Sequence, residues 1–170
     1  MNDIYIDNID LSEQKSLMRF FAQNPNLENL YLKNLDFSNI TDMTDMFFEC
    51  VTLKKIDFKN IKGGKNIDTV TFMFYNCKAL EEIDLSCLKV QSLRRIRGMF
   101  SNCINLRKID ISTWNLSDLI EMKYIFQSCY NLKEFRAEGI TELYNKGGIV
   151  SKALWNLLTR NNILIENKKG

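Results

Sequence analysis

The sequence repeats itself about every 26 residues, and this repeat limits the possible fold more than any other feature. A Met-Phe or Ile-Phe pair, followed three positions after the phenylalanine by a cysteine, occupies residues 46–50, 73–77, 99–103 and 125–129. Three residues after each cysteine, a leucine or its equivalent opens an alternating apolar run. A unit of this length cannot bury its own apolar residues, so the copies must stack and share one core.

Each unit is expected to contain one strand and one short helix. The alternating apolar runs predict short parallel strands, with side chains pointing in turn to the core and to solvent. Six such runs are visible, and a seventh is plausible near the C-terminus: 4–9, 27–32, 53–58, 80–85, 106–111, 132–137 and 163–165. In the second half of a unit, apolar residues such as Ile40, Met43, Met46 and Phe47 lie at i, i+3, i+6 and i+7. This spacing predicts a short helix with one buried side.

The chain is predicted to form a single repeat domain over residues 1–170. It contains one proline and seven glycines, too few for a linker between two domains. Residues 1–26 are interpreted as an N-terminal cap repeat with a helix at 12–21, and residues 27–140 as the regular repeats. Residues 141–170 are interpreted as a C-terminal cap: a loop at 145–148, a helix at 151–158, the last strand, and a basic tail at Lys168 and Lys169.

The wording of the units resembles a known family. The stretch at 39–50, which reads NITDMTDMFFEC, and the following Leu53-x-x-Ile56-Asp57-Phe58 are similar to the BspA-like leucine-rich repeats, including those of mycoplasma surface lipoproteins. The resemblance covers roughly residues 24–137. It implies an α/β leucine-rich-repeat solenoid, with six to seven parallel strands on one face and short helices on the other. Members of that family are often surface-exposed adhesion or host-interaction proteins, so it also implies binding through a curved parallel sheet.

The cysteines favour a reducing compartment and a structural role. Five is an odd number, and four of them lie one repeat apart, at positions 50, 77, 103 and 129. We expect no disulfides, no metal site and a buried row of small side chains, with Cys87 also structural. The first residues lack a basic and apolar export signal, and no apolar stretch approaches a membrane span of roughly 18 residues. The expected location is therefore cytoplasmic, with no membrane contact.

Catalysis has little support in the sequence. The chain has no histidine, so Ser-His-Asp and Cys-His arrangements are impossible, and no glycine-rich phosphate loop follows a strand. Neighbouring aspartates on an open sheet lack a cleft that would raise a pKa. We predict a protein that is not an enzyme and takes no cofactor and no small-molecule substrate.

The outward positions of the strands are the predicted binding surface. A parallel stack places equivalent side chains in rows about 4.8 Å apart. The tyrosines resemble binding anchors, and the aspartates either receive basic groups of a partner or only accept hydrogen bonds within the repeat. The predicted site comprises the central row Tyr5, Tyr31, Asp57, Asp84, Asp110 and Arg136, with Lys55 and Lys108 on its flank.

Two basic clusters offer a second surface. Residues 1–52 carry 3 basic and 9 acidic side chains, a net charge of −6, whereas residues 53–170 carry 20 and 12, a net charge of +8. The clusters could follow a phosphate backbone, although direct nucleic-acid binding is the weaker alternative to contact with the protein surface of a nucleoprotein complex. They consist of Lys54, Lys59, Lys62 and Lys65, with Lys55 beside them, and of Arg94, Arg95 and Arg97, with Lys89 beside them.

The leading hypothesis is an intracellular module that binds a protein partner and acts by occlusion or scaffolding. One specific version is an inhibitor made by a phage or mobile element against a host defence complex, such as an anti-CRISPR protein. The alternatives are a surface adhesion or host-interaction module, whose export signal lies outside this sequence, and a nucleic-acid or nucleoprotein binder.

Overall fold

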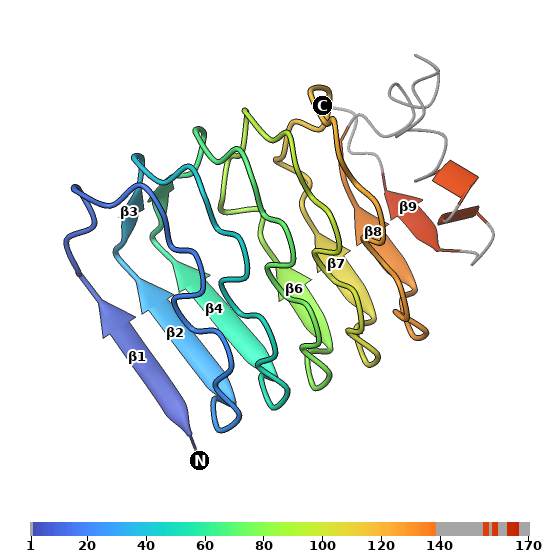
Figure 1. The fold of residues 1–170 in the computed structure, drawn as a ribbon, viewed down its shortest axis with the longest axis horizontal. Helices are drawn as coiled ribbons and strands as arrows, with labels where there is room; N and C mark the ends of the chain where they lie inside the picture. Colours follow the sequence, from blue (N-terminus) through green and yellow to red (C-terminus); the bar gives the residue numbers. More distant parts are fainter. Residues whose placement is uncertain (1, 139–154, 157, 160–162, 167–170) are drawn as a thin grey trace.

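The computed structural model describes residues 2–138, 155–156, 158–159 and 163–166, in which the chain winds into a solenoid of stacked coils (Figure 1). A coil is defined here as the stretch from one strand of the main row to the next. The strands of the main row are β1 (Asp3–Asp7), β2 (Asn29–Lys33), β4 (Lys55–Lys59), β6 (Glu82–Asp84), β7 (Lys108–Asp110), β8 (Glu134–Arg136) and β9 (Leu164–Glu166). The first six begin coils 1 to 6, and the short strands β3 (Asp36–Phe37) and β5 (Lys62–Gly63) pair in coils 2 and 3.

The main strands are parallel and in register, as the repeat predicts. Tyr5 pairs with Tyr31 and Tyr31 with Asp57, while Asp84 pairs with Asp110 and Asp110 with Arg136. The expected seventh strand is confirmed by β9, which pairs with β8 and begins one residue later than predicted. The prediction that the units stack through pairing of parallel strands is therefore confirmed.

The predicted helices of the repeats, and the first helix at 12–21, are wrong. In their place coil 2 makes two successive four-residue turns, Met43 to Met46 and Phe47 to Cys50, each closed by a bond from the fourth N–H to the first C=O. The third residue of each turn has a positive φ, 55° at Asp45 and 59° at Glu49, which is typical of type II turns. Coils 3 and 4 repeat both closing bonds, and the pair of positive φ values recurs in coils 1, 3, 4 and 5.

The backbone N–H groups of every second residue in these turns donate to carbonyls of the next coil. Met43, Asp45 and Phe47 donate from their N–H groups to the carbonyls of Thr69, Thr71 and Met73, at 2.8–3.0 Å. We call this row of turns the turn ladder; it lies on the side of the solenoid opposite the main strands. Two four-residue turns place their first and last residues at i, i+3, i+4 and i+7. A helix buries the same positions, so the apolar spacing could not separate the two structures.

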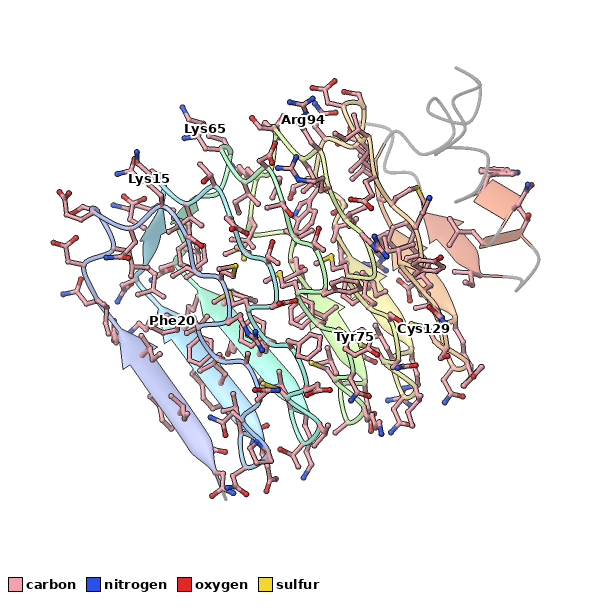
Figure 2. All side chains as sticks on the ribbon, viewed as in Figure 1. Lys15, Phe20, Lys65, Tyr75, Arg94 and Cys129 are labelled. Carbon is pink, nitrogen blue, oxygen red and sulfur yellow. The ribbon has the colours of Figure 1, made fainter. Side chains whose placement is uncertain are left out.

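The core confirms the prediction that the Met-Phe pairs are buried. Phe47, Phe74 and Phe100 are fully buried and stack with ring centroids 5.1 and 5.6 Å apart. The repeated cysteines lie beside them, and each thiol donates to the carbonyl of a phenylalanine in the preceding coil. For example, Cys103 Sγ lies 3.0 Å from the carbonyl oxygen of Phe74. The predicted cysteine row is confirmed: Cys50, Cys77 and Cys103 are buried, and Cys129, labelled in Figure 2, is partly buried.

The main row is divided into two sheets, which the repeat did not predict. β1, β2 and β4 form one sheet and β6 to β9 another, with no pairing between β4 and β6. In the first three coils the strand has five residues and ends before an asparagine with positive φ, as at Asn34 and Asn60. In coils 4 and 5 an aspartate ends the strand after three residues, because its side chain accepts the N–H two residues on.

The C-terminal prediction is tested in part. Residues 155–156 and 158–159 are helical, within or next to the helix expected at 151–158. The remainder of that helix, the loop at 145–148 and the tail at Lys168 and Lys169 lie outside the described residues. Among the described helical residues there is no segment with the length and apolar content needed to cross a membrane. The division into cap and repeat segments stays a prediction.

Candidate binding surfaces

The outward face of β1, β2 and β4 presents two stacked tyrosines. The rings of Tyr5 and Tyr31 lie 4.6 Å apart at an angle of 6°, and Tyr5 is 70% exposed. Lys55 continues the stack, because its Nζ lies 5.4 Å from the centroid of the Tyr31 ring. Parallel pairing in register places Tyr5 and Tyr31 in one row, and Lys55 reaches the Tyr31 ring from the neighbouring row, where it pairs with Asn29. Together the three side chains form an ordered aromatic and cationic platform.

Polar contacts fix both flanks of the platform. Asn29 donates from Nδ2 to Asp3 Oδ1 at 2.8 Å, and Lys33 Nζ lies 3.6 Å from Asp7 Oδ2. Partial desolvation and the nearby carboxylate of Asp3 raise the pKa of Tyr5, so the phenol keeps its proton at neutral pH. The sheet therefore offers the Tyr5 hydroxyl beside a carboxylate that Asn29 holds in place.

Two aspartates of the predicted row hold the turn that follows their strand. Asp84 and Asp110 each accept, at 2.9 Å, the backbone N–H of the serine two residues later, and Asp110 is buried. Asp57 stands in the other sheet with Lys55 Nζ 3.9 Å away, so the three aspartates do not form one continuous paired row. These contacts agree with the alternative that aspartate belongs to the pattern of the repeat.

The remaining predicted residues of the strand face form a charge network on β7 and β8. Lys108 Nζ lies 3.3 Å from Glu134, and Arg136 contacts both Glu134, at 2.6 Å, and Asp110, at 3.7 Å. The structure thus brings Lys108, Asp110 and Arg136 together at one end of the solenoid. Tyr5, Tyr31 and Lys55 form a separate group at the other end.

The predicted basic clusters do not form one surface. Lys54 pairs with Glu28 at 2.7 Å at the start of β4, whereas Lys59 ends that strand. Arg95 pairs with Asp68, and Arg97 lies 3.4 Å from Glu121. Lys65 and Arg94 lie along one rim of the solenoid, as Figure 2 shows. Carboxylates of neighbouring coils therefore counter the charge of Lys54, Arg95 and Arg97.

An aromatic cluster on the turn ladder was missed from the sequence. Phe48 stacks on Tyr75 with centroids 4.9 Å apart, and Phe72 meets Tyr75 edge-on at 5.6 Å. The guanidinium of Arg97 lies 5.7 Å from the Phe72 ring and 5.6 Å from the Tyr124 ring. The available signal was a second aromatic residue directly after the Met-Phe pair, at positions 48 and 75.

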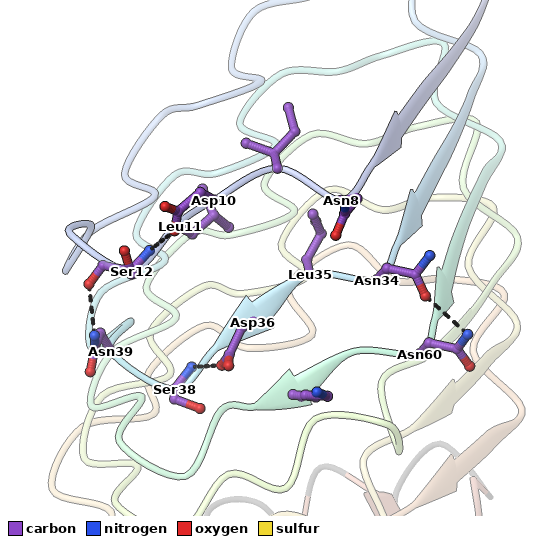
Figure 3. A pocket seen from close by; sticks show the side chains of 12 residues that line it. Asn8, Asp10, Leu11, Ser12, Asn34, Leu35, Asp36, Ser38, Asn39 and Asn60 are labelled. Carbon is purple, nitrogen blue, oxygen red and sulfur yellow. Dashed lines mark hydrogen bonds between the residues drawn. The ribbon is translucent and has the colours of Figure 1, made fainter.

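A polar groove of about 780 Å³ runs beside the ends of the first strands (Figure 3). Asp10 and Asp36 accept backbone N–H groups of Ser12 and Ser38, which lowers the pKa of both carboxyls. Asn60 donates to Asn34 at 3.1 Å. These side chains already hold turns and coils together. A ligand in the groove would therefore be recognised by shape more than by unused polar groups.

The thiols are poor nucleophiles and poor metal ligands. Burial raises the pKa of Cys87 to about 11 and that of Cys129 to about 12. Burial also raises the pKa of Cys77 and Cys103 well above the ordinary range. In the part of the chain that the structure describes, no three His, Cys, Asp or Glu side chains are grouped to hold a metal ion.

Stacked parallel coils, a shared apolar interior and ordered outer faces define a leucine-rich-repeat-like solenoid. The chain belongs to the family described as "Mycoplasma protein of unknown function, DUF285", whose model matches residues 1–103 and 63–143. This match confirms the resemblance to the BspA-like repeats found in mycoplasma proteins.

Comparison with solved structures gives a leucine-rich repeat protein from Bacteroides ovatus. Its sequence is 16% identical and the TM-score is 0.46; the alignment covers 99% of this chain and 42% of the Bacteroides chain. The present chain thus spans less than half the length of that structure. No curated protein gives a significant match.

Proposed function

We propose that this chain is a non-enzymatic module that binds a protein partner through the outward face of its first strands. The stacked pair Tyr5 and Tyr31 carries the proposal. Tyrosine is enriched among residues that dominate binding energy, and a ring held in place beforehand loses little side-chain entropy on binding. The parallel register that fixes these rings also keeps the face rigid, which suits occlusion or scaffolding.

A non-enzymatic role is supported by the side chains present. The sequence contains no histidine, and the buried thiols have raised pKa values, so a general base and an activated nucleophile are both hard to assemble. We also propose a cytoplasmic location, since all five cysteines are free thiols. Inhibition of a host defence complex, including an anti-CRISPR role, is one form of occlusion and stays a hypothesis from architecture alone.

The test begins with affinity capture on the 170-residue chain and continues with the identified partner in purified form. Calorimetry with the Tyr31→Ala variant should give an affinity weaker by roughly 30-fold, the loss typical of a binding anchor. Tyr130→Ala is the matched control, because Tyr130 is 80% exposed but lies outside the main strands. Equal affinity of both variants with the unmodified chain would place the binding surface elsewhere.

The same purified partner separates the proposed function from its alternatives. A host surface protein as partner, together with recovery of the chain in the extracellular fraction, would support the adhesion alternative and contradict the cytoplasmic proposal. Retention of nucleic acid that is lost in an Arg94→Glu variant and kept in Tyr31→Ala would support the nucleic-acid alternative.

A further inference from the structure

Among the described residues, the outer side of coil 1 leaves part of the shared core uncovered. In coil 2, Leu30 and Leu32 are fully buried between neighbouring coils. In coil 1 the apolar side chains have a neighbour on one side, and Ile9 and Phe20 are 51% and 61% exposed. Between the two coils lies a cavity of about 40 Å³ lined entirely by apolar residues, among them Ile6. The end of the stack is therefore an apolar surface that an additional layer would cover.

The backbone at this end is also open. Among the described strands, β1 pairs with β2 alone, so one of its edges carries no ladder. Asn8 donates to the carbonyl of Lys33, which shows that the even-numbered residues of this segment bond toward β2. Because alternate residues of a parallel strand bond to opposite sides, the N–H and C=O groups of Asp3, Tyr5 and Asp7 point to the open edge.

The side chains of β1 specify the charge of a strand that could pair there. Its sequence, Asp-Ile-Tyr-Ile-Asp, reads the same in both directions, with carboxylates at both flanks and isoleucines toward the core. A second β1, or any strand with acidic flanks, would place like charges opposite one another. A strand with lysine or arginine at both flanks would instead pair with both aspartates, whichever direction it runs.

A strand of this kind already fits the solenoid at an inner position. β4 reads Lys-Ile-Asp-Phe-Lys, with basic residues at the two flanks and apolar residues at the two core positions. It pairs in register with β2, whose five residues occupy the same coil positions as those of β1. The repeat therefore accommodates a basic, apolar, alternating segment next to a strand at the β1 coil position. Opposite β1 its flanks would meet Asp3 and Asp7, where opposite β2 they meet Asn29 and Lys33.

We propose that the open edge of β1 receives an extended segment of a partner protein, with basic residues four positions apart and apolar residues at the two core positions between them. The segment adds a strand to the first sheet, and its apolar residues cover the exposed end of coil 1. Strand addition uses main-chain bonds for affinity and alternate side chains for selectivity. The proposal goes beyond binding at the strand face, because it depends on the edge of β1 and not on the tyrosine rings.

The probe for the test is a labelled peptide that copies residues 53–61, which contain the β4 sequence. Fluorescence anisotropy measures its binding to the 170-residue chain, and nuclear magnetic resonance measures hydrogen exchange of the amides of β1. We expect saturable binding that weakens with salt. The complex should newly protect the amides of Tyr5 and Asp7, while the amide of Ile6, which already bonds to β2, changes little.

Two controls isolate the charge. A peptide with its three lysines replaced by glutamate, and the double variant Asp3→Lys, Asp7→Lys, should each weaken binding by roughly tenfold or more, because two attractive pairs become repulsive. The glutamate peptide tests the charge without altering the protein, which matters because Asp7 also contacts Lys33. Tyr31→Ala should leave peptide binding unchanged. Failure of the strand-face proposal can therefore be told apart from failure of the proposal for the β1 edge.

Three results would overturn the inference. They are equal binding of the lysine and glutamate peptides, protection of amides outside β1, and absence of saturable binding at millimolar peptide. Self-association of the chain through the β1 edge in sedimentation measurements, abolished by the double variant, would identify a second copy as the occupant and would also contradict the proposal.

Discussion

Replacement of Gly63 by alanine tests how closely coils 2 and 3 approach each other. Gly63 lies in β5, opposite Phe37 of β3, with a φ of 81°. A Cβ at this position would lie 2.3 Å from the backbone nitrogen and 2.6 Å from the Cα of Ser38. These atoms belong to the main chain of the neighbouring coil, so the overlap is relieved only if β3 and β5 separate.

Gly64 provides a matched control. Its φ is 90°, yet a Cβ there would meet its nearest neighbours at 3.6 Å, an ordinary contact distance. Alanine at Gly64 therefore carries mainly the cost of a positive φ, about 1–2 kcal/mol. Alanine at Gly63 carries this cost and about 1–3 kcal/mol more for the displaced backbone. The difference between the two variants measures the close approach alone.

The assay is urea unfolding, followed by circular dichroism and by the fluorescence of the buried Trp114. The free energy of unfolding should fall by about 2–5 kcal/mol in Gly63→Ala and by about 1–2 kcal/mol in Gly64→Ala. The extra loss in Gly63→Ala corresponds to a melting temperature lower by roughly 2–12 °C, at about 2–4 °C per kcal/mol for a chain of this size. Equal losses in the two variants would refute the packing of β3 against β5 described above.

Three further predictions test the core, the thiols and the aspartates. Phe74→Ala should lower the free energy of unfolding by about 3–5 kcal/mol, measured by urea titration, because it removes a fully buried ring stacked on both sides. Burial raises the folded pKa of Cys87 to about 11 and that of Cys129 to about 12, so unfolding above pH 9 releases thiol protons. The free energy of unfolding should therefore fall as the pH rises from 9 through these values. A chain with both cysteines replaced by alanine should show a shallower fall. Asp84→Ala should destabilise by about 1 kcal/mol and leave partner affinity unchanged, whereas a loss of affinity without a loss of stability would restore the binding role of this aspartate.

Much of the fold could be predicted, because the repeat is visible in the sequence as a periodic spacing of apolar side chains. Apolar residues 26 or 27 positions apart must lie above one another if all are to be buried, which fixes strand direction and register together. Leu30 above Ile4 and Ile56 above Leu30 follow from this rule alone. The same rule places the repeated cysteines in one buried row.

The turn ladder was not predictable from apolar spacing, although other residues indicated it. Gly98 and Asn102 occupy the two positive-φ positions of coil 4, and Asn76 occupies one in coil 3. Glycine and asparagine favour such conformations and weaken helices. Phe72 and Tyr124 hide the signal, because bulky residues rarely adopt a positive φ.

The candidate site was predictable in position but not in role. Alternation along the strand places Tyr5, Tyr31 and Asp84 on the outward face. The motif Asp-x-Ser at 84–86 and 110–112 marks an aspartate that accepts a nearby backbone N–H, so its structural role could have been recognised. Stacking of the tyrosines and the open edge of β1 depend on side-chain orientation and on the end of the stack, which no repeat pattern encodes.

The features that favour binding lie in the first two coils, because neighbouring coils contact most backbone and apolar groups of the inner coils. Between stacked coils the apolar faces have a neighbour above and below, most strand edges are paired, the edges of β4 and β6 that face each other excepted, and several charged side chains pair across coils, as Arg97 does with Glu121. Coil 1 combines an unpaired strand edge, uncovered apolar side chains and, on its strand face, the exposed ring of Tyr5. A partner that contacts the Tyr5 face and also pairs with the β1 edge would gain affinity from both, since the second contact becomes intramolecular once the first has formed. The binding loss in Tyr31→Ala and that in the Asp3→Lys, Asp7→Lys variant should then combine to more than the sum of their separate free energies, a non-additivity that two unrelated sites would not show.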